Sequence, residues 1–256
     1  MNAIIMGGSK GVGLSITQKL AETHDKICIV SRNLSNLNTA SNLSSNGKAK
    51  ILIFPGDISN SNFPSELNDF LKHSNFGPVE TLICNAGGPP QKVLLDTTDE
   101  DWSVAIQTLL LGPVRLVKSL IPQMIKNSYG RVIFISSTVV NEPSVDMILS
   151  ATARAGLGAF AKAAAKNFAN YNITFNVIHL GGVLTDRLSS LIENQSKLQG
   201  KNFEIVEKEL VATIPAGRFA SPDEISDLVN FLVSKKTMYI TGSSILIDGG
   251  MTKGYF

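Results

Sequence analysis

The glycine-rich segment near the start of the chain constrains the fold more than any other feature. Residues 2–6 form a short apolar run typical of a buried strand, glycines follow at positions 7, 11 and 13, and a helical pattern begins at Leu14. In a strand–turn–helix unit of this kind, backbone N–H groups and the positive end of the helix dipole can hold a pyrophosphate. The segment therefore predicts a dinucleotide site, and its alternative is an ordinary tight turn.

Length and composition are typical of one α/β domain. The 256 residues can bury one core, so we expect a single domain over 1–256. The 23 basic and 21 acidic residues do not cluster, which argues against a nucleic-acid surface. No apolar run reaches the roughly 18 residues of a membrane span, so we expect a cytoplasmic protein with no membrane partner. Cys28 and Cys84 lie in apolar runs and the three histidines are scattered, so no metal site is expected.

Strand-like and helix-like segments alternate along the whole chain. This order predicts an α/β fold, a Rossmann-like, doubly wound parallel sheet of about seven strands with helices on both faces. The expected strands are 2–6, 26–31, 51–54, 81–84, 131–135, 173–180 and 244–247. The expected helices begin at Leu14, cover 34–46, 66–73, 98 to beyond 116, 150–171 and 222–233, and form two pieces in 186–212 around Gly200. Ligands of such sheets bind beyond the carboxyl ends of the strands, here the loops 7–13, 31–32, 56–58, 85–90, 136–148 and 181–187.

Several motifs occur in an order that is more specific than any one of them. The glycine segment is followed by Cys84-Asn85-Ala86-Gly87, by Ser136-Ser137 at the end of a strand, by Tyr239-Ile240-Thr241-Gly242 and by Asp248-Gly249-Gly250. With these motifs, and over essentially the whole chain, the sequence resembles the short-chain dehydrogenase/reductase family, and most of all its 3-oxoacyl-carrier-protein reductases. The resemblance implies an oxidoreductase that uses a nicotinamide cofactor.

The resemblance also implies where the cofactor binds. Asp57 and Ile58 would border the adenine, Asn85 would support the adenosine ribose, and Thr185 would meet the nicotinamide carboxamide. The alternatives are structural: Asp57 caps a turn, Asn85 stabilises a loop, and Thr185 caps a helix. The full set implied for the cofactor is Gly7, Ser9, Lys10, Gly11, Val12, Gly13, Ser31, Arg32, Asp57, Ile58, Asn85, Ala86, Gly87, Arg154, Gly181, Val183 and Thr185.

Charge at the end of the second expected strand favours NADP(H) over NAD(H). An NAD site of this type usually presents an acidic group to the ribose 2′-hydroxyl, whereas a 2′-phosphate requires a cation. The strand ends in Ser31-Arg32 with no acid, and Lys10 in the glycine segment adds a second cation. The alternative is that both are solvated loop residues.

The expected catalytic positions depart from the family pattern. The family reduces a carbonyl with an asparagine, a serine, a tyrosine and a lysine four residues after the tyrosine. By the family's spacing the serine is Ser137, but Ser150 occupies the tyrosine position, Arg154 the lysine position and Leu109 the asparagine position. No other tyrosine in the chain has a lysine four residues later.

These departures leave two interpretations open. An aliphatic hydroxyl is a far weaker acid than a phenol with its pKa of about 10, and arginine gives up no proton at ordinary pH. We expect a reductase in which Ser137 and Ser150 hold the carbonyl oxygen and Arg154 supplies a fixed positive charge. Otherwise Ser150 is a helix cap, Arg154 lies at the surface or holds only the ribose, and the protein is an NADP-binding scaffold or redox sensor.

The substrate is a small molecule that the sequence does not identify further. The loop 141–148 and the segment 186–212, expected to be a mobile lid, would form the pocket, and an acyl chain is allowed but not indicated. By family resemblance, the helices near 98–126 and 150–171 would pair between subunits of a homotetramer or dimer. Phe160 and Phe168 would either serve there or pack in the core.

Overall fold

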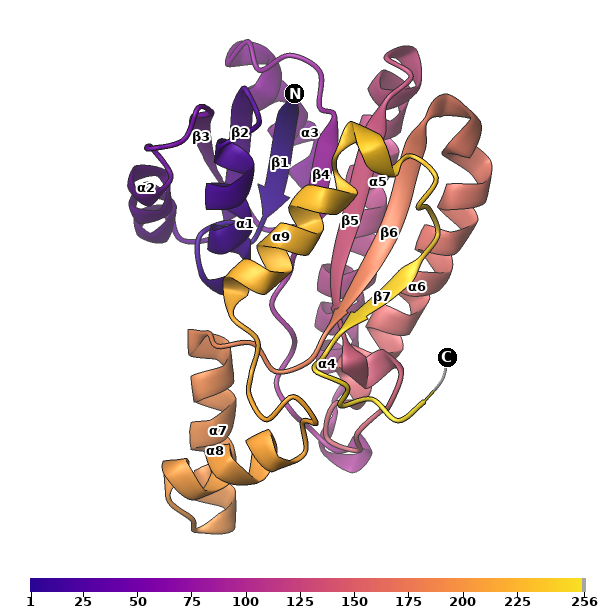
Figure 1. Ribbon diagram of the computed structural model, residues 1–256. Helices are drawn as coiled ribbons and strands as arrows, with labels where there is room; N and C mark the ends of the chain where they lie inside the picture. Colours follow the sequence, from indigo (N-terminus) through magenta and orange to yellow (C-terminus); the bar gives the residue numbers. More distant parts are fainter. Residues whose placement is uncertain (255–256) are drawn as a thin grey trace.

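Seven parallel strands form the sheet of the computed structural model, which confirms the predicted fold class (Figure 1). The strands are β1 (Asn2–Met6), β2 (Lys26–Ser31), β3 (Lys50–Pro55), β4 (Thr81–Cys84), β5 (Gly130–Ser137), β6 (Ile173–Leu180) and β7 (Ser244–Ile247). Their order is β3-β2-β1-β4-β5-β6-β7, so the direction of winding reverses between β1 and β4, where such sheets bind ligands. The structure describes residues 1–254, and the last two residues of the predicted 1–256 domain lie outside this part.

Side-chain alternation along the strands explains why helices cover both faces. The helices are α1 (Gly11–Ala21), α2 (Leu34–Leu43), α3 (Phe63–His73), α4 (Asp99–Ile106), α5 (Gly112–Lys126), α6 (Ile148–Phe168), α7 (Asp186–Gln199), α8 (Phe203–Ala212) and α9 (Pro222–Leu232). In β1, Ile4 and Met6 enter a core shared with α3, α5 and α6. Ala3 and Ile5 enter a second core with α1, α2 and α9, on the opposite face.

Local sequence signals fix several helix ends. Thr98 and Ser221 each form a capping box, with Asp101 and Glu224, and start α4 and α9 where the sequence predicts. Gly200 adopts a left-handed conformation with a φ of 63° and separates α7 from α8, as expected. Several helix boundaries differ from the prediction: α1 begins at Gly11, α2 ends at Leu43, α3 begins at Phe63, and α6 spans Ile148–Phe168.

The helix predicted from residue 98 is divided by a π-helical segment, η2 (Gln107–Leu111), which lies between α4 and α5. Pro113 is the second residue of α5, after Gly112; it has no N–H and crowds the preceding turn, which accounts for the wider turn. By length and mean hydropathy, 99–126 is the one membrane-length apolar helix within residues 1–254. Its apolar face packs in the core through Leu116, Leu120 and Met124.

The two phenylalanines offered as subunit contacts pack against the sheet. Phe160 meets Phe134 edge to face at a centroid distance of 6.1 Å, and Phe168 lies 6.1 Å from Phe175. Both are only partly buried. Both rings thus pack in the core of a single chain, as one of the two predicted roles requires. The exposed part of each ring lies at the surface of α6, where a second subunit could contact it.

The cysteines lie in the core, as the sequence predicts. Cys28 and Cys84 are buried and free, and burial raises the pKa of the Cys28 thiol to about 12. Neither thiol is therefore a reactive nucleophile. Within residues 1–254, no three histidine, cysteine or acidic side chains cluster as metal ligands would.

A buried histidine gives the fold a testable pH dependence. His24 lies 3.1 Å from the Thr23 hydroxyl and 3.3 Å from the Thr81 hydroxyl, and burial lowers its pKa from 6.5 to about 4. The unfolded chain therefore binds a proton between pH 6.5 and 4 that the folded chain does not, and stability falls as the pH falls through this window. Between pH 6.5 and 5 the free energy of unfolding should therefore fall by about 1.5 kcal/mol more for wild type than for His24→Gln, as measured by urea unfolding. His73→Gln, at an exposed position, is the control, and equal slopes for wild type and His24→Gln would contradict the prediction.

Candidate functional site

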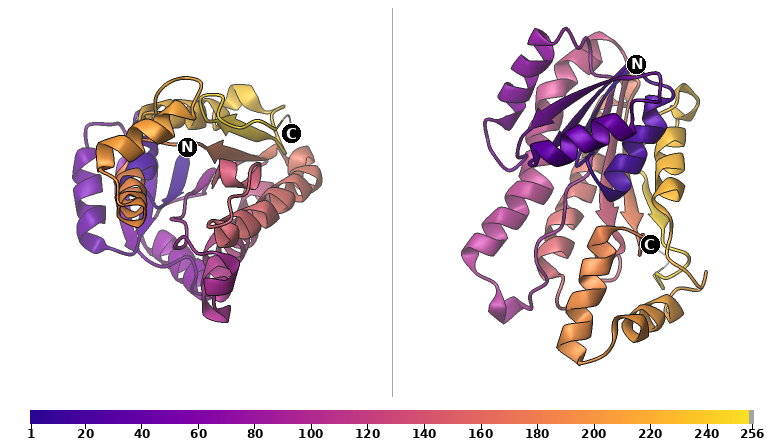
Figure 2. Two further views of the ribbon diagram at one scale, coloured as in Figure 1. Left: turned by 90° about the horizontal axis from the view of Figure 1, so that it is seen from below. Right: turned by 90° about the vertical axis from the view of Figure 1, so that its left-hand side faces the viewer.

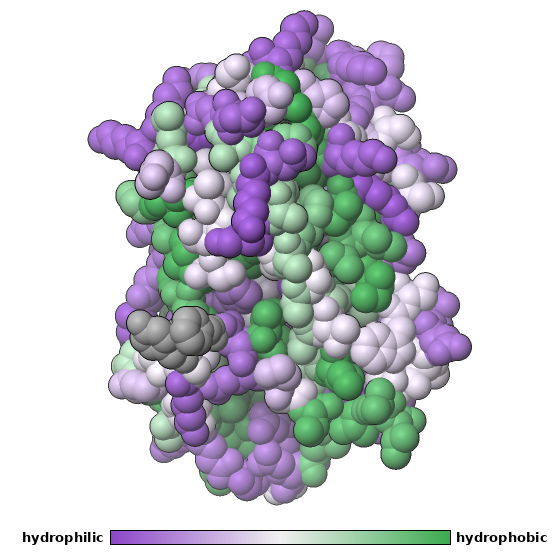
Figure 3. Space-filling view, turned by 90° about the vertical axis from the view of Figure 1, so that its right-hand side faces the viewer, coloured by the Kyte–Doolittle hydropathy of each residue, from purple (hydrophilic) through white to green (hydrophobic). Residues whose placement is uncertain are grey.

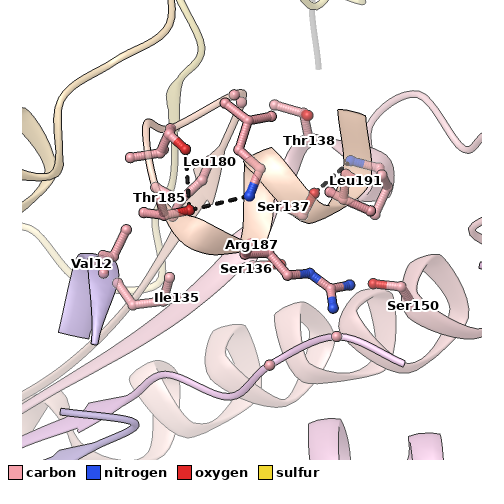
Figure 4. Close-up of a pocket in the computed structure, with 18 of the residues that line it drawn as sticks. Val12, Ile135, Ser136, Ser137, Thr138, Ser150, Leu180, Thr185, Arg187 and Leu191 are labelled. Atoms are coloured by element: carbon pink, nitrogen blue, oxygen red, sulfur yellow. Dashed lines mark hydrogen bonds between the residues drawn. The ribbon is translucent and has the colours of Figure 1, made fainter. Parts of the chain in front are cut away.

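One large cavity lies at the carboxyl ends of the strands and is lined by residues of the strand ends and of α7 and α8. In Figure 1 these helices lie below the sheet, at its carboxyl edge. Its volume is about 630 Å³, and apolar residues such as Val12, Ile135 and Leu191 share its wall with polar ones (Figure 4). The residues predicted for the site that line this cavity are Gly7, Lys10, Gly11, Val12, Asn85, Ala86, Gly87, Ser137, Ser150, Arg154, Gly181, Val183 and Thr185.

One end of the cavity is the turn between β1 and α1. Gly7 and Gly11 have positive φ values of 63° and 50°, which favour glycine. Asn85 reaches across from the end of β4, and its side-chain amide donates to the carbonyl of Gly7 at 3.4 Å. Lys10 is the N-cap of α1 but makes no side-chain cap bond, so the first N–H groups of this helix remain available to an anion.

Thr185 brings the loop after β6 to the same turn. Its hydroxyl accepts from Leu188 N at 3.4 Å and caps α7, so the structural role considered for this residue is present. Its methyl group would lie 3.0 Å from a Cβ placed on Gly11. The cap therefore coexists with a position facing the glycine turn.

The other end of the cavity holds Ser137, Ser150 and Arg154. Arg154 is 7% exposed; its Nε donates to the Ser150 hydroxyl at 3.2 Å, and its terminal nitrogens donate to Ile135 O at 2.8 Å and Ala86 O at 3.2 Å. Within residues 1–254 no carboxylate pairs with it. Burial, and then the charge of Arg187, lowers the pKa of Arg154 to about 10, so it remains a cation at neutral pH.

Two alternatives considered for these residues are wrong. Ser150 is the third residue of α6 and is buried, whereas Met147 occupies the N-cap position without a side-chain cap bond, so Ser150 is not a helix cap. Arg154 lies one helical turn further along and is buried, so it is not a surface residue. The Ser137 hydroxyl, at the end of β5, accepts from Val139 N at 3.4 Å.

Six predicted residues do not line the cavity. Gly13 is buried behind the turn, and Ile58 is buried after β3. The Asp57 carboxylate accepts from Ser59 N at 2.9 Å and from the Ser59 hydroxyl at 2.8 Å, so the turn-capping role is present. Leu109, which occupies the family's asparagine position and is not one of these six, is buried in η2 and does not line the cavity. The six outside the lining are Ser9, Gly13, Ser31, Arg32, Asp57 and Ile58.

The structure adds residues that the sequence did not single out. Arg187, the second residue of α7, lines the cavity together with Gly88 and Gln91. His179 lies behind Ser137, its Nδ1 3.1 Å from Ser137 O, and burial lowers its pKa. Arg187 falls in a loop expected to face the ligand, and that position was the only signal for it.

The segment 186–212 stands away from the sheet as a helix pair (Figure 2). The α7–α8 pair has a small core of its own, in which Ile192 and Val206 pack with Ile214 and Phe219. Leu188, Leu191 and Leu210 of this pair line the cavity.

Comparison with known proteins places this architecture in a family. The family model described as "Enoyl-(Acyl carrier protein) reductase" matches residues 7–252. The chain belongs to the short-chain dehydrogenase/reductase family. The expected family and the expected class of enzyme are both confirmed.

The relatives are similar over their full length. The "3-oxoacyl-[acyl-carrier-protein] reductase FabG" of Escherichia coli (strain K12) is 31% identical, over 97% of this chain and 96% of its own. The "NADPH-dependent reductase BacG" of Bacillus subtilis (strain 168) is 29% identical, over 98% and 97%. The crystal structure of YwfH, described as an NADPH-dependent reductase involved in bacilysin biosynthesis, superimposes with a TM-score of 0.92 at 30% identity, covering 99% of this chain and 98% of that one.

Proposed function

We propose that this protein is a cytoplasmic NADPH-dependent reductase that reduces a carbonyl, in a 3-oxoacyl compound or related ketone, within the cavity at the carboxyl ends of the strands. The observation that carries the proposal is the buried Arg154, which has no carboxylate partner within residues 1–254, at the Ser137–Ser150 end, opposite the open helix N-terminus of the glycine turn. The relatives described as NADPH-dependent reductases support the cofactor and the direction of the reaction.

The residues at the glycine turn fit a dinucleotide. Gly7, Gly11 and Val12 would face the pyrophosphate with the free N–H groups of α1, while Asn85 and Ala86 would lie along the ribose. Gly181, Val183 and Thr185 would meet the nicotinamide from the loop after β6. When bound, NADPH supplies the hydride.

Two cations would select the 2′-phosphate. Lys10 and Arg32 are exposed, and within residues 1–254 neither is in an ion pair. Ser31 ends β2 directly before Arg32 and adds a hydroxyl but no acid. A phosphate near both would gain charge-assisted hydrogen bonds that a ribose hydroxyl cannot offer.

The cofactor preference is expected to depend on Arg32. Arg32→Ala should raise the Kd for NADPH about 10-fold or more and leave the Kd for NADH within about twofold, because only NADPH carries the phosphate. Fluorescence titration of both cofactors measures this. Lys50→Ala removes an exposed cation at the other end of β3 and is the control. A wild-type Kd for NADPH no lower than that for NADH would contradict the proposal.

The catalytic set proposed here is non-standard, with Ser150 and Arg154 in place of the family's tyrosine and lysine. Ser137 and Ser150 would donate hydrogen bonds to the carbonyl oxygen, and Arg154 would stabilise the negative charge that develops on it. The alkoxide is basic enough to take its proton from water, so no side chain of suitable pKa is required. This favours reduction over alcohol oxidation, which needs a base.

The second candidate is an NADP-binding scaffold or redox sensor. It is favoured by the same observation that makes the site unusual, the lack of a phenol at the position of Ser150. Loss of NADPH absorbance with a panel of ketones, acyl-thioester analogues, quinones and activated alkenes, run beside a cofactor titration, separates the two. Tight NADPH binding with no oxidation in any reaction would overturn the reductase proposal.

We include a homo-oligomer, a tetramer or dimer, in the proposal. The face over α6 that Figure 3 turns toward the viewer carries a band of apolar residues. Next to α6, the segment before and within α4 exposes Leu94, Leu95 and Val104. Light scattering of the purified protein measures its mass in multiples of 27.4 kDa, and a monomer at micromolar concentration would contradict this part.

A further inference from the structure

Arg187 places a second guanidinium group at the Ser150 end of the cavity. Its side chain runs from the start of α7 toward Ser150 (Figure 4) and donates to Pro89 O at 3.4 Å. A Cβ placed on Gly88 would lie 3.1 Å from Arg187 Nη2 and 3.9 Å from the Ser150 hydroxyl. The guanidinium and the hydroxyl thus lie around one point above Gly88.

The charges around this point are not balanced. Lys10, Arg154 and Arg187 line the cavity, and Asp186 is the one acid among the described lining residues. Within residues 1–254 no carboxylate lies within ion-pair distance of either arginine. Two like charges near each other without a counter-ion repel, and the repulsion is relieved when an anion binds between them.

The position of Arg187 assigns its charge to the substrate and not to the cofactor phosphates. Thr185, two residues earlier, turns its methyl group toward Gly11, so it would lie between the pyrophosphate at the glycine turn and the nicotinamide that it is proposed to meet. Arg187 instead faces Gly88, Pro89 and Ser150, at the end where the carbonyl would be reduced. The N-cap and the second residue of α7 therefore face different ends of the cavity.

We propose that the substrate is a 2-oxo acid, whose carboxylate Arg187 binds while Arg154 and Ser150 face the adjacent carbonyl oxygen. The planar guanidinium can hold a carboxylate through two hydrogen bonds. In a 2-oxo acid a single bond joins the carboxylate carbon to the carbonyl carbon. The two groups are therefore close enough to meet the Arg187 guanidinium and the Ser150 hydroxyl, which lie around one point above Gly88. The inference rests on the reductase activity proposed above and narrows its substrate. The ketone gains a hydride on carbon and a proton from water on oxygen, giving a 2-hydroxy acid, while NADPH is oxidised to NADP⁺.

The test compares 2-oxohexanoate with its methyl ester and with 2-hexanone in NADPH oxidation. The acid should have the highest kcat/KM, and Arg187→Met should lower it about 10- to 100-fold while leaving the ester within about threefold, since one charged hydrogen-bond pair is lost. Arg187→Lys should recover part of the loss. Lys197→Met removes a cation at the far end of α7 and is the control. Equal use of acid and ester by wild type would overturn the proposal, as would an Arg187→Met variant whose Kd for NADPH rises as much as its activity with the acid falls.

A binding measurement separates this inference from the proposed reductase activity. Oxamate resembles a 2-oxo acid but is not reduced. Calorimetry of oxamate binding to the NADP⁺ complex therefore measures the affinity for the carboxylate without turnover. If none of the three compounds is reduced but oxamate binds to wild type and about 10-fold more weakly to Arg187→Met, the reductase proposal fails and the anion site stands. Absence of Arg187-dependent oxamate binding would overturn the anion site.

Discussion

Replacing Arg154 with methionine is expected to lower kcat/KM about 100- to 1,000-fold, mainly through kcat. The guanidinium donates to the Ser150 hydroxyl from a buried position, where an electrostatic contact is stronger than it is in water. Methionine retains much of the unbranched stem, so the helix packing is largely kept. Steady-state NADPH oxidation measures the effect. The Kd for NADPH shows how much of the fall in kcat/KM comes from a lost contact between Arg154 and the cofactor ribose.

The control for this variant is a second buried arginine. Arg131 also donates to backbone carbonyls, Gly130 O at 2.8 Å and Asn172 O at 2.9 Å, but it lies at the start of β5, at the opposite end of the strand from the cavity. Arg131→Met should lower the melting temperature while leaving kcat/KM of the folded fraction within about twofold, because it touches no reacting group. If Arg154→Met retains turnover within about threefold of wild type, Arg154 has no electrostatic role in the reaction.

The sequence predicts most of the fold because local and long-range signals agree. The strands 26–31, 81–84 and 173–180 have the predicted bounds, since each is a largely apolar segment that is buried on both faces and followed by a polar or glycine residue. The edge strand 244–247 also has the predicted bounds, although Ser244 and Leu246 are exposed. Thr98 and Ser221 start helices because their side chains accept from the backbone N–H groups of Asp101 and Glu224, which have no partner within the helix.

Features that depend on contacts between distant segments were not predictable. Gly112 approaches Ile58 so closely that a Cβ would lie 2.4 Å from the Ile58 carbonyl, and the π-helical turn before it has no sequence signal beyond Pro113. α6 begins two residues before Ser150, so this hydroxyl is buried within the first turn of the helix and is not the cap considered as its alternative role. Arg187 belongs to the cavity only because the loop after β6 brings it over Gly88.

Gly13→Ala is expected to abolish useful cofactor binding, with a rise in the Kd for NADPH of about 100-fold or more and a loss of roughly 1–3 kcal/mol in stability. A Cβ on Gly13 would lie 1.9 Å from the Gly7 carbonyl oxygen and 2.9 Å from the Asn85 side-chain amide. The carbonyl of Gly7 must therefore move, and with it the turn that is fixed by the bond from Gly7 N to Val30 O at 2.8 Å. Gly13 thus acts without lining the cavity itself.

The control is a helical glycine with open space around it. A Cβ on Gly158, within α6, meets nothing within 4 Å, so Gly158→Ala should keep the Kd for NADPH and raise stability by about 0.5–1 kcal/mol. Circular dichroism first establishes that Gly13→Ala is folded, and fluorescence titration then measures the cofactor. A folded Gly13→Ala with a wild-type Kd would mean that the turn is not what holds the pyrophosphate. In that case the open N–H groups of α1 would need another ligand, and the dinucleotide interpretation of residues 7–13 would lose its physical basis.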